Sequence, residues 1–314
     1  PNERLGKKLN ITGKGRCKVT NDTDLPGLLA NIPRNGKFLY SAFAHWGSAD
    51  TMAFFERLGV PLKVERGSRV FPVSDRAFDI SAALERRLKA LRVRWAHDRA
   101  VDIETADGAV RAVRGEGETY PADAVILATG GVSYPATGST GDGHRLAAAL
   151  GHTVTELDGS LVPLEGVIAP GVPCARLQGL SLRNVGLTVY EGKKKIYQDF
   201  GELLFTHFGV SGPLVLSASA HMRHFGKKDY RFEIDLKPAL DQNQLDKRLL
   251  ADFQKYLNHD FRNALDDLLP QKLIPVVIEL SGIPPQEKVH DITREQRLAL
   301  LAVLKAFPVA ITKK

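Results

Sequence analysis

The residues with the clearest chemical potential are two groups of glycines that lie close together in the chain. Gly130-Gly131 follows the apolar run 124–127, and Gly141-Asp142-Gly143 precedes the alanine- and leucine-rich run 145–150. Glycine lets a backbone approach a ligand without obstruction by Cβ, and the unpaired N–H groups at a helix start favour a phosphate. The pattern predicts a buried strand over 123–128, a glycine loop and a helix, which together would bind a nucleotide.

A second candidate segment lies near the start of the chain, between Gly6 and Asn21. It packs glycines, cations and small hydroxyl residues into a stretch that is too polar and glycine-rich for a core helix. Gly13, Gly15 and Arg16 form a loop that could bring backbone amides and a guanidinium against a pyrophosphate. The alternative is a surface loop whose glycines end a helix.

The third segment, Leu203–Pro213, joins an apolar strand to a helix of small residues, with His207 in the turn between them. Imidazole titrates near neutral pH, and the glycines that follow could place the ring at a cleft. His207 is therefore the natural acid/base candidate. The alternative is a structural histidine whose ring is hydrogen-bonded to the backbone.

These segments need elements to position them, and the spacing of apolar residues predicts several in the first half of the chain. Helices are predicted over 48–58, with Ser48 as the N-cap, and over 78–91. Asp107-Gly108 between two alternating runs predicts a hairpin turn.

The second half of the chain changes from a strand pattern to a helix pattern. Strands are predicted over 185–190, 195–198, 203–206 and 230–236, and helices over 244–256, 261–269, 272–280 and 293–307. We therefore expect three parts. They are residues 1–157 with the glycine loops, a β-rich domain of 158–240 and 308–314, and a helical insertion of 241–307.

In this order, the three segments resemble the BaiN/YhiN-like flavoproteins, a family of FAD-dependent oxidoreductases often labelled aminoacetone-oxidase-like. The resemblance covers nearly the whole chain and is most specific over 11–21, 128–143, 160–164 and 204–213. The chain departs from the family at Lys18, where Asn is usual, and at Gly159, where Pro is usual. The resemblance implies an α/β fold with a Rossmann-like FAD-binding domain, an inserted β-rich domain and a helical insertion.

Members of this family begin with a strand and a G-x-G-x-x-G turn and finish with a second glycine-rich segment that contacts the flavin. Neither segment is found in these 314 residues. We therefore expect the chain to be an internal fragment whose Rossmann-like domain is incomplete.

The resemblance implies FAD as cofactor, and it directs attention to residues of the glycine loops and their neighbours. The candidate FAD-binding residues are Lys8, Gly13, Gly15, Arg16, Thr20, Asn21, Val101, Ala128, Thr129, Gly130, Gly131, Gly141 and Asp142. Thr129 and the glycines after it should line the dinucleotide cleft. Val101 could contact the adenine through its backbone or simply pack in a sheet.

Three side chains are candidates for chemistry beside the flavin, which itself supplies hydride and electron transfer. Besides His207, Tyr134 could donate a proton or pack against the flavin. Cys17, next to Arg16, could have a lowered thiol pKa and do redox work, or it could be a small buried thiol. No His, Cys and carboxylate cluster has the spacing of metal ligands, and no G-x-S-x-G nucleophile motif occurs.

The resulting hypothesis is an FAD-dependent oxidoreductase that is linked to NAD(P)H and transfers hydride through the flavin to a small organic substrate. One alternative is a fumarate-reductase-like flavoprotein, which shares a Thr-Gly-Gly loop and a Thr-Gly-Asp-Gly turn but needs substrate-clamping His and Arg residues. Another is a basic RNA-associated flavoprotein or a non-catalytic binding module. Binding to RNA that weakens with salt would favour the latter.

Composition bears on partners and compartment. The net charge is +7, but the cations, including Lys193-Lys194-Lys195 and the group around Arg86-Arg87, are scattered and not interleaved with aromatics. This distribution predicts solvated surface and no nucleic-acid partner. The presence of only two cysteines fits a reducing cytoplasm, and no apolar run approaches the length of a membrane span. The sequence leaves the oligomeric state open.

Overall fold

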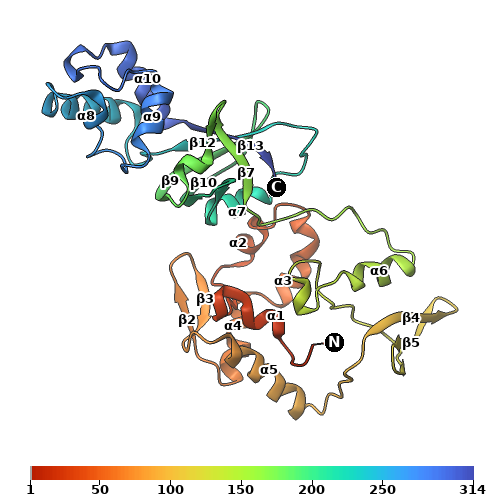
Figure 1. Cartoon of the computed structure of the whole chain (residues 1–314). Helices are drawn as coiled ribbons and strands as arrows, with labels where there is room; N and C mark the ends of the chain where they lie inside the picture. The colour runs from red at the N-terminus through yellow and green to blue at the C-terminus, as the bar shows by residue number, and fades with distance from the viewer. Residues whose placement is uncertain (1) are drawn as a thin grey trace. The chain divides into compact units, whose positions relative to one another are not determined.

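The computed structural model describes residues 2–314 (Figure 1). The chain divides into two compact units, Pro1–Glu156 and Leu157–Lys314. No helix within residues 2–314 is long and apolar enough to cross a membrane.

Unit 1 begins with short helices and a small antiparallel sheet of order β1-β3-β2. Its helices are α1 (Lys7–Ile11), α2 (Leu25–Ala30), α3 (Tyr40–His45), α4 (Ser48–Arg57) and α5 (Ala77–Ala90), and its strands are β1 (Thr20–Asn21), β2 (Leu62–Glu65) and β3 (Arg69–Pro72). The predicted helices over 48–58 and 78–91 are confirmed as α4 and α5. The N-cap prediction was wrong by one residue. Gly47 is the cap, because the Asp50 carboxylate accepts a hydrogen bond from its N–H at 2.8 Å.

A second antiparallel sheet in unit 1 has the order β4-β5-β6, formed by β4 (Ala100–Ala106), β5 (Ala109–Gly115) and β6 (Thr119–Pro121). Asp107 and Gly108 join the first two strands with φ values of 54° and 75°. Two successive left-handed residues match the right-handed twist of a hairpin. The predicted hairpin turn is confirmed.

The predicted buried strand over 123–128 is not formed. These residues lie in no strand, and the side chain of Ile126 is 93% exposed. A strand buried on both faces needs hydrogen-bonded neighbours and covering helices, whereas no described strand pairs with this run. All strand pairs among residues 2–314 are antiparallel, and the run 124–127 takes part in none of them. The helix predicted after it is confirmed as α6 (Asp142–Ala149).

Unit 2 is built on a seven-stranded antiparallel sheet of order β11-β10-β9-β12-β13-β7-β8, and β11 also pairs with β7. The strands are β7 (Leu164–Ala169), β8 (Val172–Pro173), β9 (Ser181–Glu191), β10 (Lys194–Phe205), β11 (Gly209–Ser211), β12 (Tyr230–Asp235) and β13 (Phe307–Lys313). The extra pairing closes six strands into a ring. Apolar side chains such as Leu164, Phe205 and Phe232 fill its interior. The two strands predicted over 195–206 are one strand, β10, with two register shifts.

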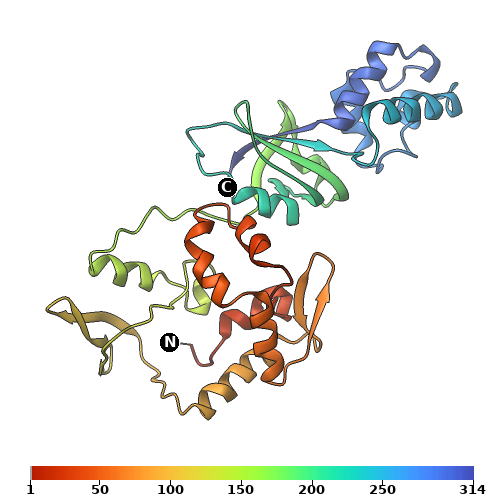
Figure 2. The same cartoon turned by 180° about the vertical axis from the view of Figure 1, so that it is seen from behind.

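Four helices complete unit 2, and α7 lies along the sheet in both views (Figures 1 and 2). They are α7 (Pro213–Ser219), α8 (Gln242–Lys255), α9 (Ile274–Ser281) and α10 (Arg294–Lys305). Asp241 and Thr293 cap α8 and α10 through their side chains. The helix predicted over 261–269 was wrong. Only the short 3-10 turn Phe261–Asn263 forms there. The apolar side chains that suggested a helix, such as Leu265 and Leu268, are buried without one.

Candidate functional site

The glycine loop of unit 1, residues 128–143, folds tightly onto the start of α6. Gly143 is buried, and a Cβ there would lie 2.2 Å from Oγ1 of Thr129. Gly130 has a φ of 78°, and a Cβ there would lie 2.9 Å from Oγ of Ser139. Only glycine fits these two positions, so the loop has the close backbone packing that its sequence predicted.

Lys8 of α1 anchors this loop from a distant part of the sequence. Its Nζ donates to the carbonyl oxygen of Ser133 at 2.9 Å, to Oγ of Ser133 at 2.9 Å and to Oγ of Ser139 at 3.0 Å. We predicted Lys8 as a direct cofactor contact, and here it shapes the loop. The two serines were missed by sequence reasoning, although their place between the two glycine groups was a usable signal.

The start of α6 does not present the free anion site that was predicted. The Asp142 carboxylate lies there and accepts hydrogen bonds from Nη2 of Arg99 at 3.2 Å and from Oγ1 of Thr140 at 3.1 Å. Arg99 is the main cause that holds the pKa of Asp142 below its usual value. A phosphate at this helix end would meet the carboxylate of Asp142, and phosphate binding by α6 stays a prediction.

Behind Asp142, one buried polar atom lacks a partner. Nδ1 of His144 on α6 has no hydrogen-bond partner among the described residues. It lies close to Gly141, whose φ of 85° marks the N-cap of the helix. A buried ring nitrogen without a partner is a position that a bound group or water can satisfy.

The second glycine loop, Thr12–Gly15, follows α1. Gly13, Lys14 and Gly15 have φ values of 57°, 59° and 83°, so three successive residues are left-handed. The loop is exposed, and the space where a Cβ of Gly15 would lie is open. A turn of this kind lets backbone N–H groups face an anion.

Arg16 is engaged by carboxylates of its own unit. Its Nη1 donates to Oε1 of Glu65 at 3.0 Å and to Oδ1 of Asp75 at 3.2 Å, and its guanidinium lies 4.0 Å from the centre of the Phe71 ring. The hydrogen bond to Glu65 is the main cause that raises the pKa of Arg16. The guanidinium would have to leave this network, which includes Lys63, before it could contact a pyrophosphate.

Cys17 is buried and left-handed, with a φ of 56°. Burial raises the pKa of its thiol, which outweighs the opposite effect of a hydrogen bond with Thr12. Of the two alternatives for Cys17, the small buried thiol agrees with the structure and a lowered pKa does not, because the effect of burial dominates. The thiol is protonated at neutral pH and has the character of a small packing residue.

The remaining candidates of unit 1 are placed by the two small sheets and the glycine loop. Thr20 and Asn21 form β1 and pair with β3. The carbonyl oxygen of Val101 in β4 accepts a hydrogen bond from Nη1 of Arg145 at 3.0 Å, so its backbone is partly engaged. Tyr134 has a φ of 53° and a side chain that is 68% exposed. Its ring is therefore open to a ligand.

His207 lies in unit 2, in the turn between β10 and β11, and it is exposed. Its ring meets the Phe208 ring edge to face at 4.9 Å. Within residues 2–314 its ring nitrogens make no hydrogen bond, so the backbone-bound structural role is not seen. An acid/base role of His207 stays a prediction.

The exposed backbones of 128–131 and 13–15 fit the phosphates of an FAD molecule. They offer glycine-lined, unobstructed surface, and Gly131, like Gly15, has open space where a Cβ would lie. The unpartnered Nδ1 of His144 is buried beside Gly141 and is not exposed on this backbone. The ionised Asp142 is the part that does not fit an anion.

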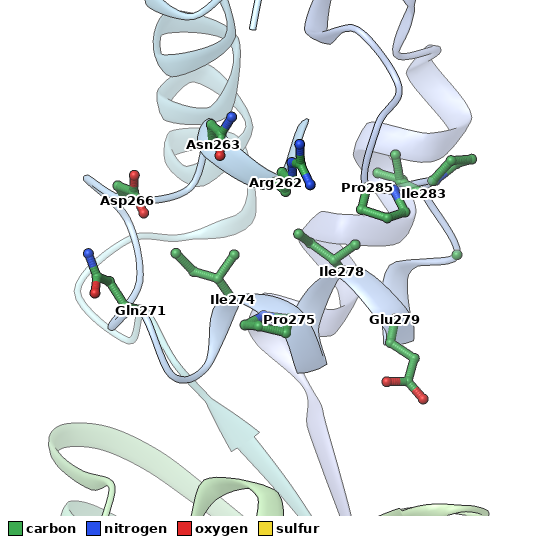
Figure 3. Close-up of a pocket in the computed structure, with 12 residues that line it drawn as sticks. Arg262, Asn263, Asp266, Gln271, Ile274, Pro275, Ile278, Glu279, Ile283 and Pro285 are labelled. Atoms are coloured by element: carbon green, nitrogen blue, oxygen red, sulfur yellow. The ribbon is translucent and has the colours of Figure 1, made fainter. Parts of the chain in front are cut away.

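A cavity of about 800 Å³ lies in unit 2 beside α9, and none of its lining residues is a predicted FAD-binding residue. Figure 3 shows its apolar lining, with Ile274, Ile278 and Pro285, and its polar side, with Asn263 and Asp266. The candidate cofactor surface of unit 1 therefore does not include this cavity.

Comparison with known proteins supports the interpretation of the glycine loops. Residues 1–268 match the family model described as HI0933-like protein Rossmann domain. The chain is 30% identical over 284 residues to a 3-dehydro-bile acid delta(4,6)-reductase of Clostridium scindens, an alignment that covers 90% of this chain and 68% of that protein.

Two further relatives have a different printed activity. The ribosomal RNA dihydrouridine synthase of Haemophilus influenzae is 28% identical over 93% of this chain and 70% of its own length. The protein of the same name from Escherichia coli is 26% identical over 96% of this chain and 72% of its own length. The resemblance and the α/β, Rossmann-like fold class expected from the sequence are confirmed, and the chain belongs to the HI0933-like family of FAD-dependent oxidoreductases.

Proposed function

We propose that this protein is an FAD-dependent reductase that saturates a carbon–carbon double bond conjugated to a carbonyl group. The observation that carries this proposal is the glycine loop of residues 128–143. Its Gly130 and Gly143 permit close backbone packing, and the exposed ring of Tyr134 lies on the same loop. When bound, FAD supplies hydride chemistry at its flavin ring.

The proposed reaction is the chemistry that the names of the relatives share. A delta(4,6)-reductase of a 3-dehydro acid saturates double bonds in conjugation with a ketone. A dihydrouridine synthase saturates the uracil C5–C6 bond, which is conjugated to the C4 carbonyl. Each reduction adds a hydride at the electron-poor end of a conjugated double bond, such as the β-carbon of uracil, and a proton at the neighbouring carbon of that bond. The site therefore needs a proton donor as well as a cofactor.

We assign the proton donor to Tyr134. Its hydroxyl makes no hydrogen bond with the described residues, whereas its carbonyl oxygen accepts bonds from the backbone N–H and the hydroxyl of Thr137 at 2.9 and 2.7 Å. The backbone is thus fixed while the ring stays exposed. A positioned phenol can act as a general acid. Cys17 is unsuitable because it is buried inside the small core of unit 1.

We propose NAD(P)H as the electron source, since a reductase needs a donor that restores the reduced flavin. We also propose a cytoplasmic location, because both Cys17 and Cys174 are free and buried, as suits a reducing compartment. A small organic molecule was the substrate class expected from the sequence. The names of the relatives add ribosomal RNA as a second class.

The test is anaerobic titration of the purified protein, reconstituted with FAD, with NADH and NADPH. Bleaching of the flavin absorbance, followed by its return on addition of an α,β-unsaturated ketone or of uridine-containing RNA, is the expected result. Failure to bind FAD would overturn the proposal. Bound flavin that is reduced but is reoxidised by oxygen alone, and by neither acceptor, would limit the protein to an oxidase.

A further inference from the structure

We propose that one end of the sheet in unit 2 binds the phosphate backbone of RNA. The surface is formed by the turn between β9 and β10 and by the loop that leads into β12. Its members are exposed cations, here called the basic turn surface: Lys193, Lys194, Lys195, Arg223, Lys227 and Lys228.

Strand pairing brings these two segments together although they are some thirty residues apart. The backbone N–H of Gly192 donates to the carbonyl oxygen of Asp229 at 2.9 Å, and Nη1 of Arg231 donates to the carbonyl oxygen of Gly192 at 2.7 Å. Tyr230 is the register partner of Glu191 in the β12–β9 pair. The lysines of the turn therefore lie beside the loop that carries Lys227 and Lys228.

The cations of the basic turn surface form no ion pair within the described residues, although the charge of Lys228 helps to lower the pKa of Glu191. None of its six cations has a carboxylate oxygen within 4 Å, whereas other lysines of unit 2, such as Lys255 and Lys305, are ion-paired. The nearest acid of the turn, Glu191, accepts hydrogen bonds from Tyr230 and His224. Uncompensated like charges that gather on one surface attract a polyanion.

Two cations of unit 2 that lie outside the basic turn surface, Arg231 and Lys314, contact aromatic rings. The Arg231 guanidinium lies 4.1 Å from the centre of the Tyr190 ring, and Nζ of Lys314 lies 5.7 Å from that of Phe225. Both cations are also ion-paired, Arg231 with Glu233 and Lys314 with Asp158, so the inference rests on the charges of the basic turn surface and not on these rings. It is made against the expectation from the sequence that the chain has no nucleic-acid partner, which stays untested.

The choice of RNA rests on the proposed function, because a uracil ring in RNA is one of the two acceptor classes that the relatives suggest. The charge argument does not depend on it. Phosphate contacts position a nucleic acid without reading its sequence, and each one makes binding weaker as salt rises. The basic turn surface would thus hold RNA while chemistry takes place elsewhere.

The experiment compares two triple variants of the full chain by fluorescence anisotropy with a fluorescein-labelled RNA hairpin. The test variant is Lys193→Gln/Lys194→Gln/Lys195→Gln. The control is Arg183→Gln/Lys247→Gln/Arg294→Gln, which removes three exposed cations of unit 2 that also have no carboxylate within 4 Å. Both variants lose the same net charge, so only the place of the charge differs.

We expect the test variant to bind RNA at least about tenfold more weakly than the wild type, and its log–log salt slope to fall by about 2 to 3. The control should stay within about twofold. Equal weakening of both variants, or no binding by the wild type at low salt, would overturn the proposal. Equally tight binding of a DNA hairpin, or binding of phosphatidylserine vesicles in place of RNA, would assign the surface to another anion and overturn the RNA inference.

Two readouts separate this inference from the proposed function. Flavin content and bleaching by NADPH are measured on the same samples, and thermal unfolding checks that each variant is folded. A wild type that binds RNA through the turn but never bleaches would end the reductase proposal and leave the surface. A wild type that reduces the double bond of an unsaturated ketone but does not bind RNA would support the reductase proposal and overturn the inference about RNA.

Discussion

The sheet of unit 2 and the glycine-loop region of unit 1 bury apolar residues to very different degrees. In unit 2, one continuous cluster fills the sheet and reaches the helices, with Phe205, Phe232 and Phe307 fully buried. In unit 1, the buried cluster is small and centred on Ile80, while Ile126 beside the glycine loop is almost bare. The difference teaches that unit 2 is stabilised by its own packing, whereas the candidate cofactor surface of unit 1 has the most to gain from a ligand.

The two units can be compared directly by asking which of them supplies the proton donor, Tyr134 in unit 1 or His207 in unit 2. Replacement of Tyr134 by Phe keeps the ring but removes the hydroxyl, so kcat for reduction of an unsaturated ketone should fall about 100-fold or more. Flavin content should not change. The measurement is steady-state kinetics of the two variants Tyr134→Phe and His207→Gln.

The histidine variant should have the smaller effect on kcat. Loss of activity in His207→Gln with activity retained in Tyr134→Phe would place the acid in unit 2 and contradict our assignment.

The difference in packing between the two units can be tested with one variant in each unit. Phe232→Ala should lower the free energy of unfolding of unit 2 by about 3–5 kcal/mol, because it leaves a cavity in a closed core. Ile126→Ala should change stability by no more than about 0.5 kcal/mol, because its side chain is exposed. Denaturation by urea, followed by circular dichroism, gives both values. A large cost at Ile126 would mean that this side chain is buried in solution.

The two cysteines report on the two units separately, since Cys17 is buried in unit 1 and Cys174 in unit 2. Thiol labelling requires that the unit opens. FAD at about 100 times its dissociation constant should slow labelling of Cys17 by about 100-fold and leave Cys174 unchanged. Mass spectrometry of labelled peptides measures both rates. Equal slowing of both thiols would show that the cofactor stabilises the units together.

The smallest expected effect concerns alkaline pH. Burial raises the pKa of Cys174 to about 11 from 9.0, so the unfolded thiol ionises at a lower pH than the folded one. The stabilisation of the folded state that follows from this pKa difference is complete below pH 9. It is lost as pH rises towards 11. Unfolding of unit 2 should thus become easier over this range, and Cys174→Ala should flatten the dependence. An unchanged profile in the variant would assign the alkaline loss to other groups.

Local patterns predicted the elements that depend on local contacts. The apolar spacing of α5 and the Asp107-Gly108 turn are properties of short windows, and the structure has them where expected. The run 124–127 failed because composition favours a strand but cannot supply the neighbouring strands that a ladder requires. The missing information was whether strands from distant parts of the chain lie beside this run.

Contacts between residues that are distant in the sequence also explain why the predicted and observed contacts of the candidate site residues differ. Lys8 bonds to serines 125 and 131 residues away, and Arg16 bonds to carboxylates 49 and 59 residues away. The residue types were informative about charge and glycine content. Which opposite charge each cation would find could not be known before the chain was folded.

The closure of the sheet in unit 2 also has a consequence for handling the protein in solution. Because β11 pairs with both β10 and β7, six strands have neighbours on both sides, and only the two-residue β8 ends the order. Unpaired strand edges are the usual templates for aggregation. The extended run 124–127, apolar and without a partner strand, is such a template, whereas the closed sheet is not. Self-association of this chain should therefore begin at unit 1.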